Sequence, residues 1–492
     1  MARITEVAER KKKSLCQVLR EAIGDNKVKD DENVLLTYSY DSSPTPQQKP
    51  SAVVLPENSE DVKKILKIAN ENKIPIAVMA YGVNAAGGCI PTEGGIVLDL
   101  RRMDKIVEIN TDSGYATIEP GVTFDKLTAA LAEKGYRCQI PASPGGTSVI
   151  ANYLLRPSGN FTTKHLDPVL DLDVVLPDGT LFSTGSSAFT NIGSCLRYGP
   201  FPDLTGMFCC AYGTLGVITK AAVRIYPINE ARDAILVAFD NFKQSSEFTK
   251  DIIANNIPEH CFIWHWHLYR TDEIEYSADW VPDVPPELYE DPFKPPEGIP
   301  YNVVTVLVSG YQEWVATAQK LCAKIAPKYG GRVIPREESE KTMPGSVRRW
   351  TEYYCNYHQV MDKNFAFGRY FPYLCIGEPQ DIIDLEPWAL KKLDSLGVRP
   401  CAYYAMPFDF GRSMFFRIFI YVDPYNEEIL QKTKDTMAEL NAEAFKRYRA
   451  IPFRYRRGWT LQQSTGEYYN FLKKIKSVVD PNNILNPQMG LF

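Results

Sequence analysis

The first half of the chain alternates short apolar runs with amphipathic segments, beginning at Ser51. Apolar residues recur at helical spacing in SEDVKKILKIANEN and VTFDKLTAALAEKG, which predicts two helices. Two further segments, KIVEINTDSGYATIEPG and DVVLPDGTLFSTG, alternate around the turn signals Asp112-Ser113-Gly114 and Asp178-Gly179 and therefore predict hairpins. With the apolar runs SAVVLP, IPIAVM and GIVLDL, they indicate a domain of mixed helices and strands.

The pattern changes after Pro227. The runs CFIWHWHLY, VVTVLVSG and MFFRIFIYV predict strands, and EWVATAQKLCAKIA and EEILQKTKDTMAELNAEAFKRY predict helices. The glycine-rich loops of the first half disappear here. A second α+β domain is therefore expected to follow the first.

The stretch AYGVNAAGGCIPTEGGIVLDL, residues 80–100, places five glycines between two predicted strands. Glycine costs backbone entropy, so such a cluster marks a turn with positive φ or the close approach of another group. Two interpretations stay open on these residues alone: a wide surface loop, or a loop whose backbone N–H groups hold an anionic ligand such as phosphate. A second cluster follows in PASPGGTS, residues 141–148. The usual dinucleotide fingerprint, GxGxxG between a strand and a helix, is absent.

Composition narrows the class of protein. The 492 residues carry a net charge of −5, with a pI near 5.8, and no basic stripe is interleaved with aromatic residues, which argues against a nucleic-acid binder. No apolar run is long enough to cross a bilayer, and the N-terminus lacks the apolar core of a secretory signal. The eleven cysteines contain no CxxC pair, so we expect reduced thiols and a cytoplasmic protein.

The order of the sequence pieces resembles a known family. SAVVLPENSEDVKKILKIAN, IPIAVMAYGVNAAGG, GIVLDLRRMDKIVEIN and GYATIEPGVTFDKL are similar to the FAD-binding domain of the vanillyl-alcohol oxidase / p-cresol methylhydroxylase (PCMH) superfamily. GPFPDLTGMF, AYGTLGVITKAAVRIYP and VVDPNNILNP continue the similarity. The resemblance implies an α+β fold, with a two-part PCMH-type FAD-binding domain and an α+β cap that holds the substrate. Its parts would be an N-terminal helical segment and lead (1–50), the FAD-binding domain (51–227), the cap (228–440) and a C-terminal return to the FAD domain (441–492).

By the same resemblance, FAD would be held by the two glycine clusters and by a later stretch of small residues. The expected cofactor-binding residues are Tyr81, Gly82, Val83, Asn84, Ala85, Ala86, Gly145, Gly146, Thr147, Ser148, Ala151, Asn152, Gly216, Val217 and Ile218. In the aromatic-alcohol branch a histidine or tyrosine links the flavin covalently. Phe415–Phe416 stand at the place of the linking histidine and cannot bond a flavin, so we expect noncovalent FAD.

That branch also carries a Tyr-Arg pair near the C-terminus, and Tyr448-Arg449 falls at the matching place in FKRYRAIPFRYRRGW. Tyrosine would donate a hydrogen bond and arginine would favour an ionised phenol, whose electron density assists hydride loss at the benzylic carbon. We expect this pair to be catalytic; the alternative is a basic, solvated helix end. Two departures weaken the assignment, since Ala85–Ala86 replace a substrate-binding tyrosine and Ser143 replaces an acidic residue.

Other polar residues are candidates for substrate binding. His265 and His267 are two apart in EHCFIWHWHLYR, so that a strand would place both on one face, as pocket residues, as structural partners or as metal ligands. We expect no metal. Arg369, Tyr370 and Arg412 lie in FGRYFPY and FGRSMFF, where an arginine could hold a carboxylate.

These signals predict an FAD-linked oxidase or dehydrogenase that oxidises a para-substituted phenol, of the 4-alkylphenol or 4-hydroxybenzyl alcohol type, by hydride transfer to flavin N5. Two alternatives stay open: a dehydrogenase of 2-hydroxy acids such as lactate or glycolate, and a flavin subunit of an electron-transfer complex. We expect a small-molecule substrate and a homodimer or higher homo-oligomer. A protein electron acceptor, such as a cytochrome or an electron-transferring flavoprotein, is a further possible partner, and neither nucleic acid nor a membrane span is expected.

Overall fold

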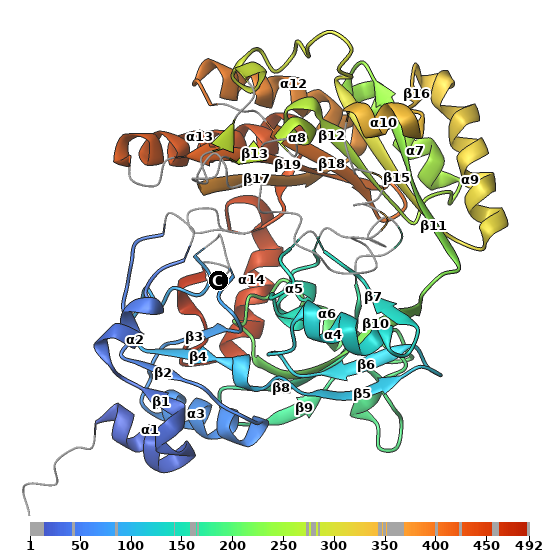
Figure 1. Ribbon diagram of the computed structural model, residues 1–492. Helices are drawn as coiled ribbons and strands as arrows, with labels where there is room; N and C mark the ends of the chain where they lie inside the picture. The colour runs from blue at the N-terminus through green and yellow to red at the C-terminus, as the bar shows by residue number, and fades with distance from the viewer. Residues whose placement is uncertain are drawn as a thin grey trace, which may run out of the picture.

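The computed structural model describes residues 14–41, 45–83, 87–141, 143–157, 164, 167–271, 275–276, 282–283, 286–342, 347, 351, 369–398, 402–422, 426–454 and 462–489. Two bodies of structure lie one above the other (Figure 1). We call the lower one the N-terminal domain and the upper one the cap.

A small, mostly parallel sheet forms the first half of the N-terminal domain. Its order is β1-β2-β4-β3, in which β1 is antiparallel and the other strands are parallel. Helices cover both faces, so the strands are apolar throughout: Val54 and Leu98 pack toward α1 and α3, while Val53 and Val97 pack toward α2. The elements are α1 (Leu15–Ile23), β1 (Val28–Lys29), α2 (Glu32–Thr37), β2 (Ala52–Val54), α3 (Ser59–Glu71), β3 (Ile76–Met79) and β4 (Ile96–Asp99).

An antiparallel sheet forms the second half, in the order β5-β6-β10-β8-β9, with β7 also paired to β10. The long strand β10 pairs with β6, β7 and β8 and so joins the sheet together. Both predicted hairpins are present, as β5–β6 and β8–β9. The elements are β5 (Ile106–Asn110), β6 (Tyr115–Ile118), α4 (Phe124–Ala132), β7 (Tyr136–Cys138), α5 (Val149–Tyr153), β8 (Val169–Val175), β9 (Leu181–Ser183), α6 (Leu204–Phe208) and β10 (Val217–Pro227).

The cap is built on an eight-stranded antiparallel sheet of order β16-β11-β15-β12-β18-β19-β17-β20. Side chains alternate between its faces. Helices, among them α7 and α12, cover one face of the sheet (Figure 1). Tyr403 and Phe416 contact Phe242 of α7 on this helix-covered face, and Tyr404 and Arg417 lie on the opposite face. The principal elements are β11 (Ala231–Phe239), α7 (Phe242–Ala254), β12 (His260–His265), α8 (Trp266–Thr271), β15 (Asn302–Gly310), α9 (Gln312–Ile325), β16 (Arg332–Val333), α10 (Arg336–Thr342), β17 (Arg369–Gly377), α12 (Pro379–Ser395), β18 (Ala402–Phe408), β19 (Ser413–Val422), α13 (Glu427–Tyr448) and β20 (Ile451–Pro452).

The chain then returns to the N-terminal domain. After α14 (Gln462–Val479), the tail runs beside β3, where Ile76 N–H donates to Ile484 O at 2.7 Å and Asn486 N–H donates to Ile76 O at 2.8 Å. Among the described residues, no helix is both long and apolar enough to span a membrane.

Candidate cofactor and substrate site

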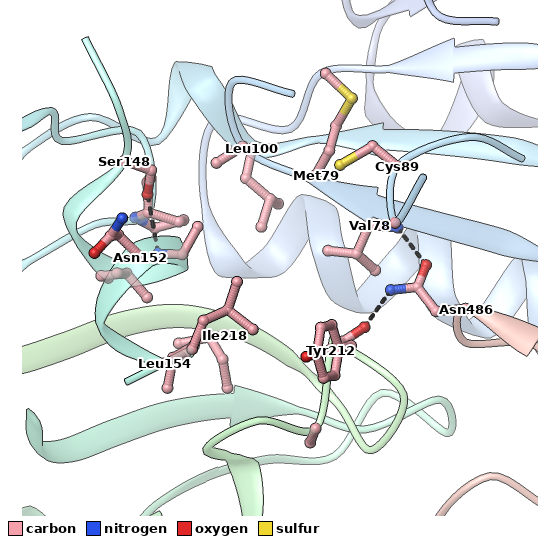
Figure 2. Close-up of a pocket in the computed structure, with 18 of the residues that line it drawn as sticks. Val78, Met79, Cys89, Leu100, Ser148, Asn152, Leu154, Tyr212, Ile218 and Asn486 are labelled. Carbon is pink, nitrogen blue, oxygen red and sulfur yellow. Dashed lines mark hydrogen bonds between the residues drawn. The ribbon is translucent and has the colours of Figure 1, made fainter. Parts of the chain in front are cut away.

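A cavity of about 210 Å³ lies between the two sheets of the N-terminal domain. Four segments form most of its wall: the end of β3 with the first glycine loop, the start of α5, the stretch before β10, and the C-terminal tail (Figure 2). Most of the lining residues are apolar and many are small, which suits a ligand that contacts them along its length.

Many of the predicted cofactor-binding residues meet at this cavity. Its wall includes Tyr81, Gly82, Val83, Thr147, Ser148, Ala151, Asn152, Gly216 and Ile218. Gly145, Gly146 and Val217 are not part of the wall, and Asn84, Ala85 and Ala86 lie outside the described residues. The individual binding roles stay predictions.

Close packing explains two of the glycines near β10. A Cβ on Gly216 would lie 2.5 Å from Cγ1 of Val174, and one on Gly213 would lie 2.8 Å from Nδ2 of Asn486. Gly213 also has φ of +70°, a conformation that L side chains rarely adopt. Side chains at these positions would push the wall of the cavity out of place.

Asn486 is a residue of this site that sequence reasoning missed. Its side chain accepts a hydrogen bond from Val78 N–H at 2.8 Å and donates one to Tyr212 O at 2.6 Å, which ties three separate segments together (Figure 2). The motif VVDPNNILNP marked this return of the chain, but nothing in it singled out the asparagine that makes both bonds.

The cavity has the chemistry to hold FAD. Two buried polar atoms on its wall, Thr147 Oγ1 and Asn152 Oδ1, have no hydrogen-bond partner among the described residues. Buried polar atoms are normally paired, so these two are candidates to bind polar groups of a ligand. The apolar part of the wall, with Val78, Leu100 and Ile218, suits flat rings.

The face of the cap sheet opposite its helices carries an aromatic wall. Trp264, Tyr404 and Phe419 pack ring to ring at centroid distances of 5.4 and 6.0 Å, and Phe415 joins Tyr404 at 5.8 Å. The Arg417 guanidinium lies 4.5 Å from the Phe419 ring, and its Nη1 donates to the Tyr404 hydroxyl at 3.3 Å. The wall therefore combines flat apolar surface with positive charge.

A second guanidinium connects this wall to the cavity. Arg454, just beyond β20, stacks on the Phe453 ring at 4.3 Å, and its Nη2 donates to Arg156 O at 3.4 Å. Arg156 follows Leu155, which lines the cavity. Burial lowers the pKa of Arg454, and nearby Arg417 lowers it further. Among the described residues Arg454 has no carboxylate partner, so its charge is available to an anion.

Comparison with known proteins agrees with this geometry. A family model described as an FAD binding domain matches residues 50–185, and one described as the C-terminal domain of FAD linked oxidases matches residues 453–489. The flavoprotein subunit of 4-cresol dehydrogenase (hydroxylating) from Pseudomonas putida is 26% identical, covering 96% of this chain and 94% of that protein. The structure of p-cresol methylhydroxylase with substrate bound has a TM-score of 0.83 at 22% identity, covering 96% of both chains.

The chain is an FAD-linked oxidoreductase that carries an FAD binding domain and the C-terminal domain of FAD linked oxidases, and its fold is that of the PCMH-type structures. The predicted fold class and the FAD cofactor are thereby confirmed. Another relative, glycolate oxidase subunit GlcD of Bacillus subtilis (strain 168), is 34% identical over 233 residues, which are 46% of this chain and 48% of that protein. The match thus spans about half the length of that relative.

The predicted catalytic pair of this FAD-linked oxidoreductase lies away from the cavity. Tyr448 packs against Trp388 of α12, at a ring distance of 5.6 Å, and neither Tyr448 nor Arg449 lines the cavity. Arg449 ends α13 in the left-handed conformation, its side chain is 71% exposed, and its Nη2 pairs with Asp381 at 2.7 Å. This ion pair raises the pKa of Arg449. The placement gives the phenolate-binding role no support.

The two histidines do not share a strand face. β12 ends at His265, and Trp266 begins α8, so His267 is helical. Both are fully buried, with ring centroids 5.2 Å apart, and His265 stacks on Tyr403 on the helix-covered face of the cap. Neither lines the cavity. Within the residues that the structure describes, no group of three or more His, Cys, Asp or Glu could hold a metal.

His265 packs against two tyrosines, Tyr301 and Tyr403, that bind a buried carboxyl group. Oε1 of Glu386, on α12, accepts hydrogen bonds from the hydroxyls of Tyr301 and Tyr403, each at 2.7 Å. Burial raises the pKa of Glu386 to about 7, although both tyrosine hydrogen bonds act to lower it. This group belongs to the interior of the cap.

Three predicted substrate-binding residues remain, and the structure describes the side chain of only one of them, Arg412. Arg412 is 71% exposed in the turn between β18 and β19, where it pairs with Asp409 at 2.6 Å. Arg369 and Tyr370 begin β17 opposite Val422 and Tyr421, and their side chains lie outside the described part of the structure.

Proposed function

We propose that the protein oxidises a para-substituted phenol, of the 4-alkylphenol or 4-hydroxybenzyl alcohol type. The observation that carries the proposal is the aromatic wall of the cap, which holds Arg417 and lies next to Arg454 beside the cavity. FAD, when bound, supplies the flavin N5 that accepts the hydride. Thr147, Ser148 and Asn152 are proposed to bind it from the N-terminal domain.

The residues of the wall have distinct tasks in this proposal. Arg454 and Arg417 attract the phenol oxygen as its anion and lower its pKa, because a positive charge nearby favours the ionised form. The Tyr404 hydroxyl, which accepts from Arg417, can donate its own proton in a hydrogen bond to that oxygen. Trp264 and Phe415 supply flat surface and keep water from the reacting carbon.

One relative supports this substrate class along nearly the whole chain. Similarity to the 4-cresol dehydrogenase flavoprotein subunit runs through 96% of the chain and therefore includes the cap. The name of that relative also supports a partner subunit, so a protein such as a cytochrome is proposed as electron acceptor. The homo-oligomer, the cytoplasmic location and the noncovalent state of FAD stay predictions.

A 2-hydroxy acid such as glycolate or lactate is the second candidate. The GlcD relative supports it, and the two arginines that would hold a phenolate could equally hold a carboxylate. In that case the aromatic wall would have little substrate surface to cover, which is why the phenol is preferred.

Anaerobic bleaching of the flavin tests the choice. We expect 4-hydroxybenzyl alcohol and 4-ethylphenol to bleach the flavin, whereas benzyl alcohol, which lacks the phenol group, does not. Bleaching by glycolate or lactate alone would overturn the phenol proposal. Bleaching of the isolated chain by a compound of either class would exclude the alternative that the chain is only a flavin subunit of a larger electron-transfer complex.

A further inference from the structure

The N-terminal lead is built into the wall of the cofactor cavity. Leu35 and Tyr38 of this lead pack in one cluster with Met79 and Cys89, both of which line the cavity. The Tyr38 hydroxyl donates to Asp99 Oδ2 at 2.9 Å, and Asp99 pairs with Arg101 at 2.6 Å. The lead therefore packs against residues that line the cavity and helps to hold them in place.

One contact of this lead reaches the first glycine loop. Gly87 N–H donates to Oδ2 of Asp41 at 3.0 Å. Gly87 is buried with φ of +77°, and Ile90 N–H donates back to its carbonyl at 3.3 Å, so Gly87 begins a tight turn. Gly88 and Cys89, the next two residues, line the cavity, whereas Gly87 does not.

We propose that Asp41 is a positioning residue for FAD: by accepting the Gly87 amide, it fixes the turn that presents Gly88 and Cys89 to the cofactor. The amide of Gly87 is then engaged by the protein, and Asp41 acts on the cofactor through the loop. A loop rich in glycine has many backbone conformations to lose on binding, and an anchor lowers that cost in advance. The inference concerns FAD binding and does not depend on the substrate.

The shape of the contact predicts which property of Asp41 matters. The carboxylate supplies a hydrogen-bond acceptor at the right place, and an asparagine carbonyl can supply the same acceptor without charge. If instead the carboxylate acted by its charge, it would repel a phosphate-bearing cofactor, and its removal would tighten binding.

The test is titration of the apoprotein with FAD, in which the quenching of flavin fluorescence measures binding. We expect Asp41→Ala to raise the Kd for FAD about tenfold, since it removes the acceptor of the Gly87 amide. Asp41→Asn should stay within about twofold of the wild type, because the acceptor remains. The flavin-to-protein ratio of the purified variants should follow the same order, and it is the readout if apoprotein cannot be prepared.

A matched control separates loop positioning from loss of the lead. Asp31 caps α2 through the amides of Asn33 and Val34 at 3.0 and 3.3 Å, so Asp31→Ala should lower the melting temperature of the apoprotein without changing the Kd for FAD. Asp41→Ala should do the reverse. Wild-type affinity in Asp41→Ala, equal weakening in Asp41→Asn, or clearly tighter binding by Asp41→Asn would each overturn the proposal.

Discussion

The cavity of the N-terminal domain is lined by several separate segments that include many glycines and other small residues, whereas the aromatic wall of the cap is made of large side chains on separate strands. The first kind of wall depends on where the backbone runs, and it is held there by contacts such as that of Asn486 with Val78 and Tyr212. The second kind depends on a few side chains, so a single substitution can change what is bound. Substitutions on the cofactor side are therefore expected to change the Kd for FAD, and substitutions in the wall of the cap are expected to change kcat/KM.

Replacing Arg454 should have the largest effect. Arg454→Met is expected to lower kcat/KM for a phenol by about a hundredfold or more, as loss of a buried charged contact costs roughly 2–4 kcal/mol. The Kd for FAD should change little, because Arg454 does not line the cavity. Steady-state kinetics and FAD titration of the same preparation measure both. Wild-type turnover would show that the anion binds elsewhere.

Glu386 gives a prediction for the helix-covered side of the cap. Its raised pKa of about 7, against an ordinary value of 4.5, means that the folded protein binds the extra proton, so the wild type loses stability relative to Glu386→Gln as the pH rises from about 4.5 to 7. The difference should approach 3 kcal/mol, an order-of-magnitude figure. Melting temperatures of both proteins across this range measure it, and parallel curves would contradict the assignment. Turnover at a fixed pH should be similar.

Asn486→Ala should act on the cofactor side. The change removes two hydrogen bonds and leaves Val78 N–H and Tyr212 O without their partner, so we expect about a tenfold weaker affinity for FAD. Substrate specificity, measured as the ratio of kcat/KM for two phenols in flavin-saturated protein, should not change. A changed ratio would mean that the two walls are coupled.

Arg449→Met should have the smallest effect. The ion pair of its exposed side chain with Asp381 is screened by solvent and should contribute little to stability, and kcat/KM should stay within about twofold of the wild type. Tyr448→Phe should be similarly silent. A hundredfold loss of kcat/KM in Arg449→Met would support the predicted catalytic role of Tyr448 and Arg449, and it would contradict a substrate site at the aromatic wall.

The sequence predicted the parts whose signals are local. Turn residues at Asp112-Ser113-Gly114 marked the β5–β6 hairpin, and the glycine clusters marked the loops that reach the cavity. The wall of the cap could not be found this way, because Trp264, Tyr404 and Arg417 come together only when β12, β18 and β19 pair. Arg454 could not be found this way either. In the sequence it is one arginine of a basic run, and only the folded structure places it beside Arg156. His267 was misplaced because the helix α8 begins directly after the strand β12, without a turn signal between them.

The tail beside β3 has a consequence for how the protein is made. Val78 and Asn486 are 408 positions apart, and the cavity has its full wall only when both are present. A ribosome must therefore synthesise the chain through Asn486 before this wall of the flavin site can form. Until then a nascent chain lacks the hydrogen bonds that Asn486 makes with Val78 and Tyr212.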